Sequence, residues 1–279
     1  MVGKSPELMN LYWSAAGIFP GDAEISSFAL EDRAQSAARA GFGGLSFWHT
    51  DLDHMLETRS LVELRSILDG NGLVTFEVEF LEDWFVDGEA RRRSDLRRHR
   101  LFEAAERLDA HHVKVGDFHN TPTTMPQLID SFGGLCADAA SHGVTIGFEF
   151  MASAMIHRLA DCLAMVTGAG AANGGLIVDI AHTNALGISN AAVAGMPKGS
   201  IVSVELNDNL RATTQGYDPS ARRYCGDGEL DVRGFIAAAR LAGYNGPWAV
   251  EVFNRRLAGV SLAELDRVAF DATLAMFTD

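Results

Sequence analysis

The chain has 279 residues, of which 47% are apolar and 22% charged, and its formal net charge is -14. These values exclude a disordered or fibrous chain, and the negative charge makes nucleic acid an unfavourable partner. No apolar run reaches the roughly 18 residues that a membrane span needs, and the N-terminus lacks a signal-peptide pattern. Three widely spaced cysteines are typical of a reducing compartment. We therefore expect a cytoplasmic protein with no nucleic-acid or membrane partner.

Short β-rich runs alternate with longer segments of helical period along the chain. The expected strands are Asn10–Ala15, Gly44–Trp48, Leu73–Phe80, His112–Gly116, Val144–Phe150, Gly175–Ile180, Ile201–Leu206 and Trp248–Phe253. The expected helices are Leu30–Ala40, Glu57–Asp69, Ala90–Ala110, Met125–His142, Ile156–Gly168, Asp231–Ala242 and Ser261–Phe277. Several strands are apolar at consecutive positions, which indicates a parallel sheet covered by helices on its outer face and filled on its inner one.

Eight strands separated by helices are typical of a (β/α)8 TIM barrel. An open doubly wound sheet would carry a glycine-rich phosphate turn after its first strand. The stretch Ser14-Ala-Ala-Gly-Ile18 has no such spacing. No low-complexity stretch or linker divides the sequence. We therefore predict an α/β protein with a single TIM-barrel domain over residues 1–279.

Each of the last four expected strands places one carboxylate after an apolar run. These carboxylates are Glu149, Asp179, Glu205 and Glu251. The carboxyl ends of barrel strands converge on one mouth, so the four side chains should share a cavity. At ~4 Å and an effective dielectric near 20, each pair would repel by about 4 kcal/mol. A divalent cation held by all four is the simplest compensation; Mn²⁺ is favoured, and Mg²⁺, Co²⁺ or Zn²⁺ would also suit such a site.

His182 lies three residues after Asp179, at the start of the following loop. It shares the rim of the barrel with the acidic cluster. We expect it either to ligate the ion or to hydrogen-bond a substrate hydroxyl.

Five stretches in the second half of the chain carry a family resemblance: Gly147–Glu149, Val178–His182, Val204–Asp208, Cys225–Asp231 and Gly243–Glu251. They resemble the xylose-isomerase-like superfamily of barrels, which includes sugar-phosphate isomerases, ketose 3-epimerases, inosose dehydratases and endonuclease IV. In ketose epimerases of this type, Glu, Asp, His and Glu hold a divalent ion, and the two glutamates move the proton beside the substrate carbonyl. The resemblance implies that Glu149 and Glu251 are catalytic ligands and that Asp179 is a ligand.

The sequence departs from the family pattern at Glu205, where the family usually has His. Relatives resembling 3-dehydroshikimate dehydratases have Gln there, so an oxygen ligand at this position has a precedent. The glutamate adds a negative charge to the site, which puts a direct transfer of epimerase activity in doubt more than it does metal binding.

Several further residues are candidates for substrate binding. Arg223 follows the seventh strand and could hold a substrate oxygen or pair with a nearby acid at the surface; Arg211 is the other candidate, since related epimerases resemble it in placing an arginine at that offset. Lys114, within the fourth strand, would bind substrate, transfer a proton or neutralise the acidic cavity. His49 and Glu79 end the second and third strands, where Glu79 could orient a polyol.

Tryptophans near strand ends or in loops would give a sugar ring an apolar wall, although core packing is their commoner role. They are Trp13, Trp48 and Trp84.

The first functional hypothesis is a divalent-metal-dependent isomerase or epimerase that transfers an α-proton of a keto-sugar or polyol-derived substrate through an enediolate. The alternative is a lyase on the same intermediate, similar to 3-dehydroshikimate or inosose dehydratases. A non-catalytic sugar-binding barrel is a third interpretation. In each case the partner is a small sugar or keto-polyol, and the sequence leaves open whether the chain forms a homo-oligomer.

Overall fold

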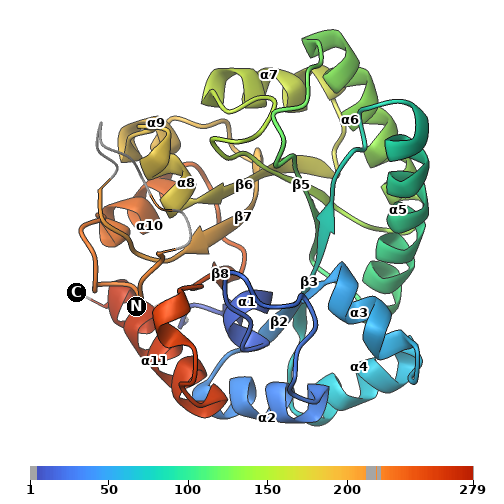
Figure 1. The fold of residues 1–279 in the computed structure, drawn as a ribbon. Helices are drawn as coiled ribbons and strands as arrows, with labels where there is room; N and C mark the ends of the chain where they lie inside the picture. Colours follow the sequence, from blue (N-terminus) through green and yellow to red (C-terminus); the bar gives the residue numbers. More distant parts are fainter. Residues whose placement is uncertain (1–4, 212–217, 219–220, 279) are drawn as a thin grey trace.

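The computed structural model describes residues 5–211, 218 and 221–278. All eight strands are parallel and pair in sequence order, and β8 closes the barrel on β1 (Figure 1). The strands are β1 (Leu8–Asn10), β2 (Gly44–Trp48), β3 (Thr75–Leu81), β4 (His112–Val115), β5 (Ile146–Glu149), β6 (Gly174–Asp179), β7 (Ile201–Leu206) and β8 (Trp248–Val250). The TIM-barrel prediction is confirmed.

Helices surround the barrel and cover its outer face (Figure 1). They are α1 (Tyr12–Ala15), α2 (Leu30–Ala40), α3 (His49–Leu56), α4 (Leu61–Gly70), α5 (Gly88–Leu108), α6 (Met125–Ala140), α7 (Leu159–Ala169), α8 (Ile180–Ala185), α9 (Asn190–Ala194), α10 (Val232–Leu241) and α11 (Leu262–Leu274), with short 3₁₀ turns at Arg255–Leu257 and Ala275–Phe277. No helix in the described part of the chain is both long and apolar enough to cross a membrane.

Local sequence signals set the ends of several helices. Ser60 begins α4 with a capping box, in which its hydroxyl accepts from the backbone N–H of Glu63 and the Glu63 carboxylate accepts from the backbone N–H of Ser60. Gly41 ends α2 in the left-handed region, with φ of 112°. A Cβ at Gly41 would lie 2.6 Å from the ring of Phe270, so the glycine also lets α2 and α11 pack closely.

The first expected strand is wrong over most of its length. The strand ends at Asn10, and Tyr12–Ala15 form a helical turn that packs against β2. A short buried apolar run has no periodicity that separates a strand from a helix. Among the other seven strands, β2 and β7 have the expected bounds, and the remaining five differ at one or both ends by one to three residues.

The interior of the barrel is polar on one side, although such interiors are usually filled by branched apolar side chains. Side chains alternate along a strand, and this alternation turns Glu77 and Glu79 of β3, and His112 and Lys114 of β4, toward one another. All four side chains are buried. The main apolar core instead lies between the strands and the surrounding helices. The interior of the barrel therefore has room for charged groups.

Candidate metal centre and substrate pocket

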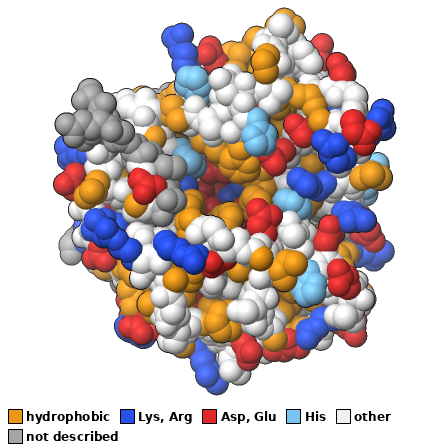
Figure 2. Space-filling model, in the orientation of Figure 1, with side chains coloured by type: hydrophobic (Ala, Val, Ile, Leu, Met, Phe, Trp, Pro, Cys, Tyr) orange, Lys and Arg blue, Asp and Glu red, His pale blue; other side chains and the backbone are white. Residues whose placement is uncertain are grey.

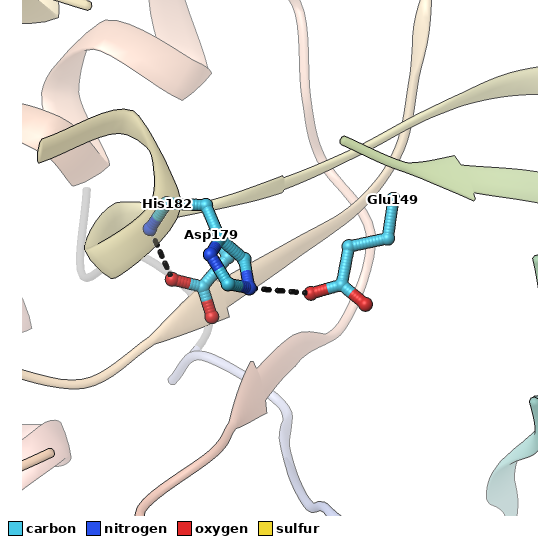
Figure 3. A group of neighbouring side chains, drawn as sticks. All are labelled: Glu149, Asp179 and His182. Carbon is cyan, nitrogen blue, oxygen red and sulfur yellow. Dashed lines mark hydrogen bonds and ion pairs between the residues drawn. The ribbon is translucent and has the colours of Figure 1, made fainter. Parts of the chain in front are cut away.

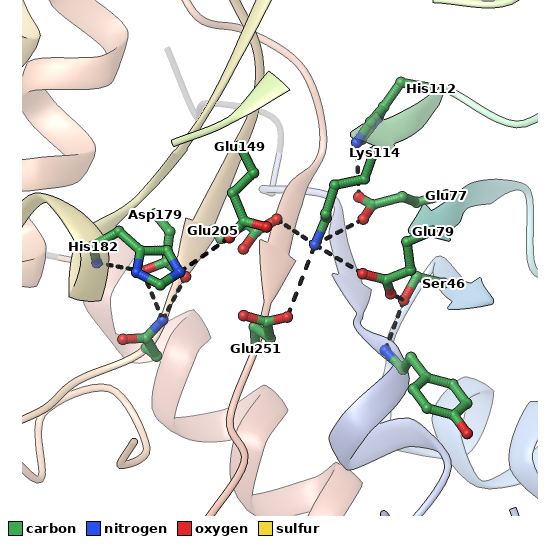
Figure 4. A network of polar contacts seen from close by, with 12 residues as sticks. Ser46, Glu77, Glu79, His112, Lys114, Glu149, Asp179, His182, Glu205 and Glu251 are labelled. Atoms are coloured by element: carbon green, nitrogen blue, oxygen red, sulfur yellow. Dashed lines mark hydrogen bonds and ion pairs between the residues drawn. The ribbon is translucent and has the colours of Figure 1, made fainter. Parts of the chain in front are cut away.

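The carboxylates expected to meet at the strand ends do lie together in the structure (Figure 4). Glu149, Asp179 and Glu205 belong to β5, β6 and β7, and Glu251 directly follows β8. The β6–β7 register places Asp179 opposite Glu205. One oxygen of each of the four lies within 4.8 Å of one oxygen of every other, and all four residues are buried. We call these residues the carboxylate quartet.

Two buried cations contact the quartet from different sides. The Lys114 Nζ lies 2.7 Å from Glu205 Oε1 and 3.8 Å from Glu251 Oε1. The Arg222 guanidinium ion-pairs with Glu251 and lies 3.1 Å from Asp179 Oδ2. It also stacks over the ring of Phe253, with 4.6 Å between the guanidinium carbon and the ring centroid. Each cation therefore forms ion pairs with two members of the quartet.

Asp179 fixes the start of α8 and thereby the position of His182. The Asp179 Oδ1 accepts hydrogen bonds from the backbone N–H groups of Ala181 and His182, as an N-cap does. Its two oxygens also accept from Asn207 Nδ2 at 3.3 and 3.1 Å. The His182 imidazole then points at Glu149, with 3.2 Å between Nε2 and Oε1 (Figure 3). His182 and the quartet form one hydrogen-bonded cluster.

The cluster holds more negative charge than its fixed cations balance. Lys114 and Arg222 face six buried carboxylates: Glu77, Glu79, Glu149, Asp179, Glu205 and Glu251. Burial raises the pKa of Glu205 well above its ordinary value; Lys114 opposes that shift, and the charges of Glu149 and Asp179 reinforce it. Without another cation, a proton is therefore favoured at Glu205.

The pKa of Glu149 shifts in the opposite direction. Burial by itself would raise its pKa, but Lys114, the His182 hydrogen bond and Arg222 outweigh burial and lower the pKa to about 2. Glu149 is therefore a carboxylate at neutral pH and is available as an oxygen ligand or as a proton acceptor.

The quartet fits a divalent cation that prefers oxygen ligands. Its oxygens are close enough to share one ion, and the second oxygen of Glu205, Oε2, is buried without a hydrogen-bond partner among the described residues. A cation there would supply the charge that the cluster lacks. Ligand atoms of Glu149, Asp179 and His182 also lie within 4.8 Å of one another. The structure is therefore compatible with His182 as an ion ligand and with His182 as a partner of a substrate hydroxyl.

A cavity of about 460 Å³ opens over the quartet. Figure 2 shows it as a hollow with charged atoms on its floor and hydrophobic side chains around its mouth. Its floor includes Glu79, Glu149, Glu251, His182 and Arg222. Its apolar wall, which we call the aromatic rim, consists of Trp13, Trp48, Phe80, Phe118 and Phe253.

Members of the aromatic rim pack on one another. Phe118 stacks on Phe80 with ring centroids 4.6 Å apart, and Trp13 lies 5.4 Å from both Trp48 and Phe253. Flat apolar faces of this kind suit a compact ring and offer few hydrogen bonds to an extended chain of hydroxyls.

Beneath the quartet lies a second buried polar layer. Lys114 Nζ is 3.0 Å from one oxygen of Glu77 and 3.0 Å from one oxygen of Glu79. The other oxygen of Glu77 is 2.9 Å from His112 Nε2, and Glu79 accepts a hydrogen bond from Ser46. Figure 4 shows the Lys114 ammonium between this layer and the quartet, in contact with both.

The remaining candidates from the sequence are placed as follows. Glu79 lines the cavity and Lys114 lies under it. His49 is not among the described residues that line the cavity. Its Nδ1 accepts a hydrogen bond from the backbone N–H of Phe80 at 3.4 Å. Burial and the nearby charge of Arg97 lower the pKa of His49 to about 3. Trp84 is buried in the core against α6 and β5.

Arg222 reaches the site, whereas the sequence interpretation named Arg223 and Arg211. The side chain of Arg223 donates to the backbone oxygen of Asp227, and that of Arg211 to the backbone oxygen of Glu229. A β-bridge between Arg223 and Asp208 explains the difference, because successive side chains in extended backbone point to opposite sides. Asn207 was also missed, although its spacing of two residues from Glu205 placed it on the same side of the strand.

The comparisons with known proteins bear on this geometry. A family model described as the xylose isomerase-like TIM barrel matches residues 34–273. The chain belongs to this family. It is 30% identical over 241 residues to a 3-dehydroshikimate dehydratase of Pseudomonas aeruginosa, which covers 82% of this chain but 37% of the relative. The chain thus spans little more than a third of that curated relative.

Solved structures share the fold at lower sequence identity. A xylose isomerase-like TIM barrel/4-hydroxyphenylpyruvate dioxygenase fusion protein superposes with a TM-score of 0.83 at 20% identity, over 98% of this chain and 43% of the other. The IolI protein, whose crystal structure has a bound zinc atom, superposes with a TM-score of 0.82 at 16% identity, over 97% of each chain. These xylose isomerase-like neighbours confirm the barrel architecture.

Proposed function

We propose that this xylose isomerase-like barrel is a divalent-metal-dependent lyase that removes water from a small cyclic keto-polyol. The observation that carries the proposal is the position of the quartet and His182 on the floor of a cavity with aromatic walls. The name of the Pseudomonas aeruginosa relative supports the same reaction class. The sequence placed isomerisation first and dehydration second; the shape and apolar walls of the cavity favour the reverse order.

The quartet would hold the ion, with Mn²⁺ favoured among divalent metals that accept oxygen ligands. When bound, such an ion supplies Lewis-acid polarisation of a substrate carbonyl, worth several kcal/mol at the transition state. Glu205 and Asp179 contribute oxygens from neighbouring strands of the rigid barrel. The aromatic rim would orient the substrate ring and exclude water from the reacting carbons.

Proton transfer would then be divided between two sides of the pocket. Glu251 is the group that we assign to removal of the proton on the carbon next to the carbonyl. The electron pair of that C–H bond forms the new double bond as the C–O bond of the β-hydroxyl breaks. His182, held by Glu149 at 3.2 Å, would protonate the departing oxygen, which leaves as water. Arg222 contacts both Glu251 and His182 and would orient the two groups.

Epimerisation is the second candidate, and one observation favours it. Glu149 and Glu251 are both buried carboxylates at the cavity floor, on strand ends that are not adjacent in the barrel. One could remove the α-proton and the other could return a proton to the opposite face. The two reactions share their first step and differ in whether the hydroxyl leaves.

The test follows both outcomes at once. Metal-stripped protein is reloaded with Mn²⁺ in D₂O and incubated with 3-dehydroshikimate and with a panel of keto-sugars, while ultraviolet absorbance and proton spectra are recorded. Formation of a conjugated product with loss of water supports the lyase. Deuterium at the α-carbon with the hydroxyl retained would replace it with the epimerase. Absence of both across the panel would contradict an enzyme of either type.

A matched pair of variants controls the experiment. Glu251→Gln removes the proposed base without changing side-chain size, and activity should fall by about 10²–10⁴-fold. Glu103→Gln makes the same change on the exposed face of α5 and should leave activity unaltered. Full activity in the Glu251→Gln variant would remove this residue from the mechanism.

A further inference from the structure

The contact between Lys114 and Glu205 joins opposite parts of the barrel wall. Lys114 is on β4 and Glu205 on β7, and between these strands the barrel order has β5 and β6. Their side chains nevertheless meet in the interior, with Nζ 2.7 Å from Oε1. This is the shortest of the four distances from Nζ to carboxylates. The pair is fully enclosed by protein, since both side chains are at most 1% exposed.

The two oxygens of Glu205 have different surroundings. Oε1 forms an ion pair with the Lys114 ammonium at 2.7 Å; beyond that ion pair, neither oxygen has a hydrogen-bond partner among the described residues, so Oε2 is the oxygen left unengaged. The Glu205 carboxylate belongs to the group whose oxygens are close enough to share one ion. The lysine therefore occupies one oxygen and leaves the other for a ligand role.

Charge explains why such an arrangement is useful. Four ionised carboxylates around a divalent ion leave a buried excess of two negative charges, which is unfavourable in a medium of low dielectric. A lysine in contact with one of the four carboxylates cancels one of these two negative charges. The other contacts of Lys114, with Glu77 and Glu79, keep its ammonium from moving away when the ion binds.

We propose that Lys114 and Glu205 act as one electrically neutral ligand unit, in which Lys114 is a positioning residue that cancels the charge of Glu205 and directs Oε2 toward the ion. The inference rests on the proposed metal centre. It assigns Lys114 neither to substrate binding nor to proton transfer, two of the roles that the sequence left open.

The proposal predicts an unusual pattern of substitutions. Glu205→Gln removes one negative charge from the quartet while the positive charge of Lys114 stays beside it, so Mn²⁺ affinity should fall by about 10- to 100-fold. Removing Lys114 as well restores the original net charge, so the double variant Lys114→Met/Glu205→Gln should bind Mn²⁺ more tightly than Glu205→Gln alone and within about 5-fold of the unaltered protein. A lysine whose charge did not act on the ligand set would not improve binding when removed.

The experiment measures Mn²⁺ affinity by competition with a chelating fluorophore, which requires no turnover. Lys114→Gln/Glu205→Gln is measured in parallel, because Gln retains a polar group beside Glu77 and Glu79 if Met prevents folding. Far-UV circular dichroism and denaturation midpoints establish that each variant is folded. Lys198→Met/Glu205→Gln is the matched control, since Lys198 is exposed, and it should bind no better than Glu205→Gln.

The outcomes separate this inference from the proposed function. Rescue by either Lys114 double variant, without rescue by the Lys198 variant, supports the neutral pair. If the unaltered protein binds Mn²⁺ and both folded Lys114 double variants bind as weakly as Glu205→Gln or more weakly, the pair is overturned while the metal centre stands. If the unaltered protein does not bind Mn²⁺, both proposals are overturned.

Discussion

Arg222 offers a direct test of whether an ion and the protein's own cation use the same oxygens. Its guanidinium contacts Asp179 and Glu251, two members of the quartet, and its side chain is 2% exposed. Arg222→Met keeps an apolar stem of similar length over Phe253 but removes the charge. In metal-free protein this leaves two buried carboxylates without their nearest cation.

The size of the effect follows from the geometry. At 3.1 Å from Asp179 and an effective dielectric near 20, the Coulomb attraction is about 5 kcal/mol. Breaking a buried pair by removing one partner typically lowers the free energy of unfolding by about 3–5 kcal/mol. At about 2 °C per kcal/mol for a chain of this size, the metal-free variant should melt about 6–10 °C below the unaltered protein.

Saturating Mn²⁺ should reduce this loss of unfolding free energy to less than half, because the ion neutralises the same carboxylates that Arg222 contacts. By linkage, the variant must then bind Mn²⁺ more tightly than the unaltered protein. The assay is thermal denaturation with EDTA and with Mn²⁺, and Arg223→Met is the control because its side chain donates to the backbone oxygen of Asp227, outside the site. An equal loss of stability with and without Mn²⁺ would refute the shared use of these oxygens.

Three further predictions concern the pocket and its surroundings. His182→Asn should lower kcat by about 10²-fold or more and leave Mn²⁺ affinity within a few-fold in a binding titration; a large loss of affinity would make His182 a ligand instead. Phe118→Ala removes an exposed wall of the aromatic rim and should raise KM for a cyclic substrate by about 10-fold, with little change in kcat; an unchanged KM would remove this residue from substrate contact. The folded-state pKa of His49 is lowered to about 3, so the unfolded chain takes up this proton first, and stability should fall by at most about 2 kcal/mol between pH 7 and pH 5. His49→Gln should flatten that part of the pH profile of the denaturation midpoint, and an identical profile in the variant would contradict the assignment.

The parts of the molecule that the sequence predicted are those set by periodicity and by fold geometry. Seven strands were recognised because runs such as Leu176–Val178 are apolar at consecutive positions and are followed by helix signals. The barrel then required Glu149, Asp179, Glu205 and Glu251 to meet, because parallel strands end at one mouth. The prediction of their convergence follows from topology alone, and the structure confirms that geometry.

The parts that the sequence did not predict depend on long-range contacts. Arg222 lies in a connection after β7, where nothing in the local sequence distinguishes it from Arg223; only the bridge to Asp208 decides which side chain faces inward. The partners of Lys114 could not be named either, because they come from β3, from β7 and from the segment after β8. The sequence indicated that an inward lysine needs an acid, and the three-dimensional register selected which ones.

The central claim is that the quartet binds one divalent cation, and equilibrium dialysis tests it most directly. EDTA-treated protein is dialysed against Mn²⁺, and the bound metal is counted for the unaltered chain, for Glu149→Gln and for the exposed control Glu103→Gln. The account predicts about one ion per chain in the unaltered and control proteins and a large loss of affinity in Glu149→Gln. Binding of less than about 0.2 equivalents by the unaltered protein, or undiminished binding by Glu149→Gln, would contradict it.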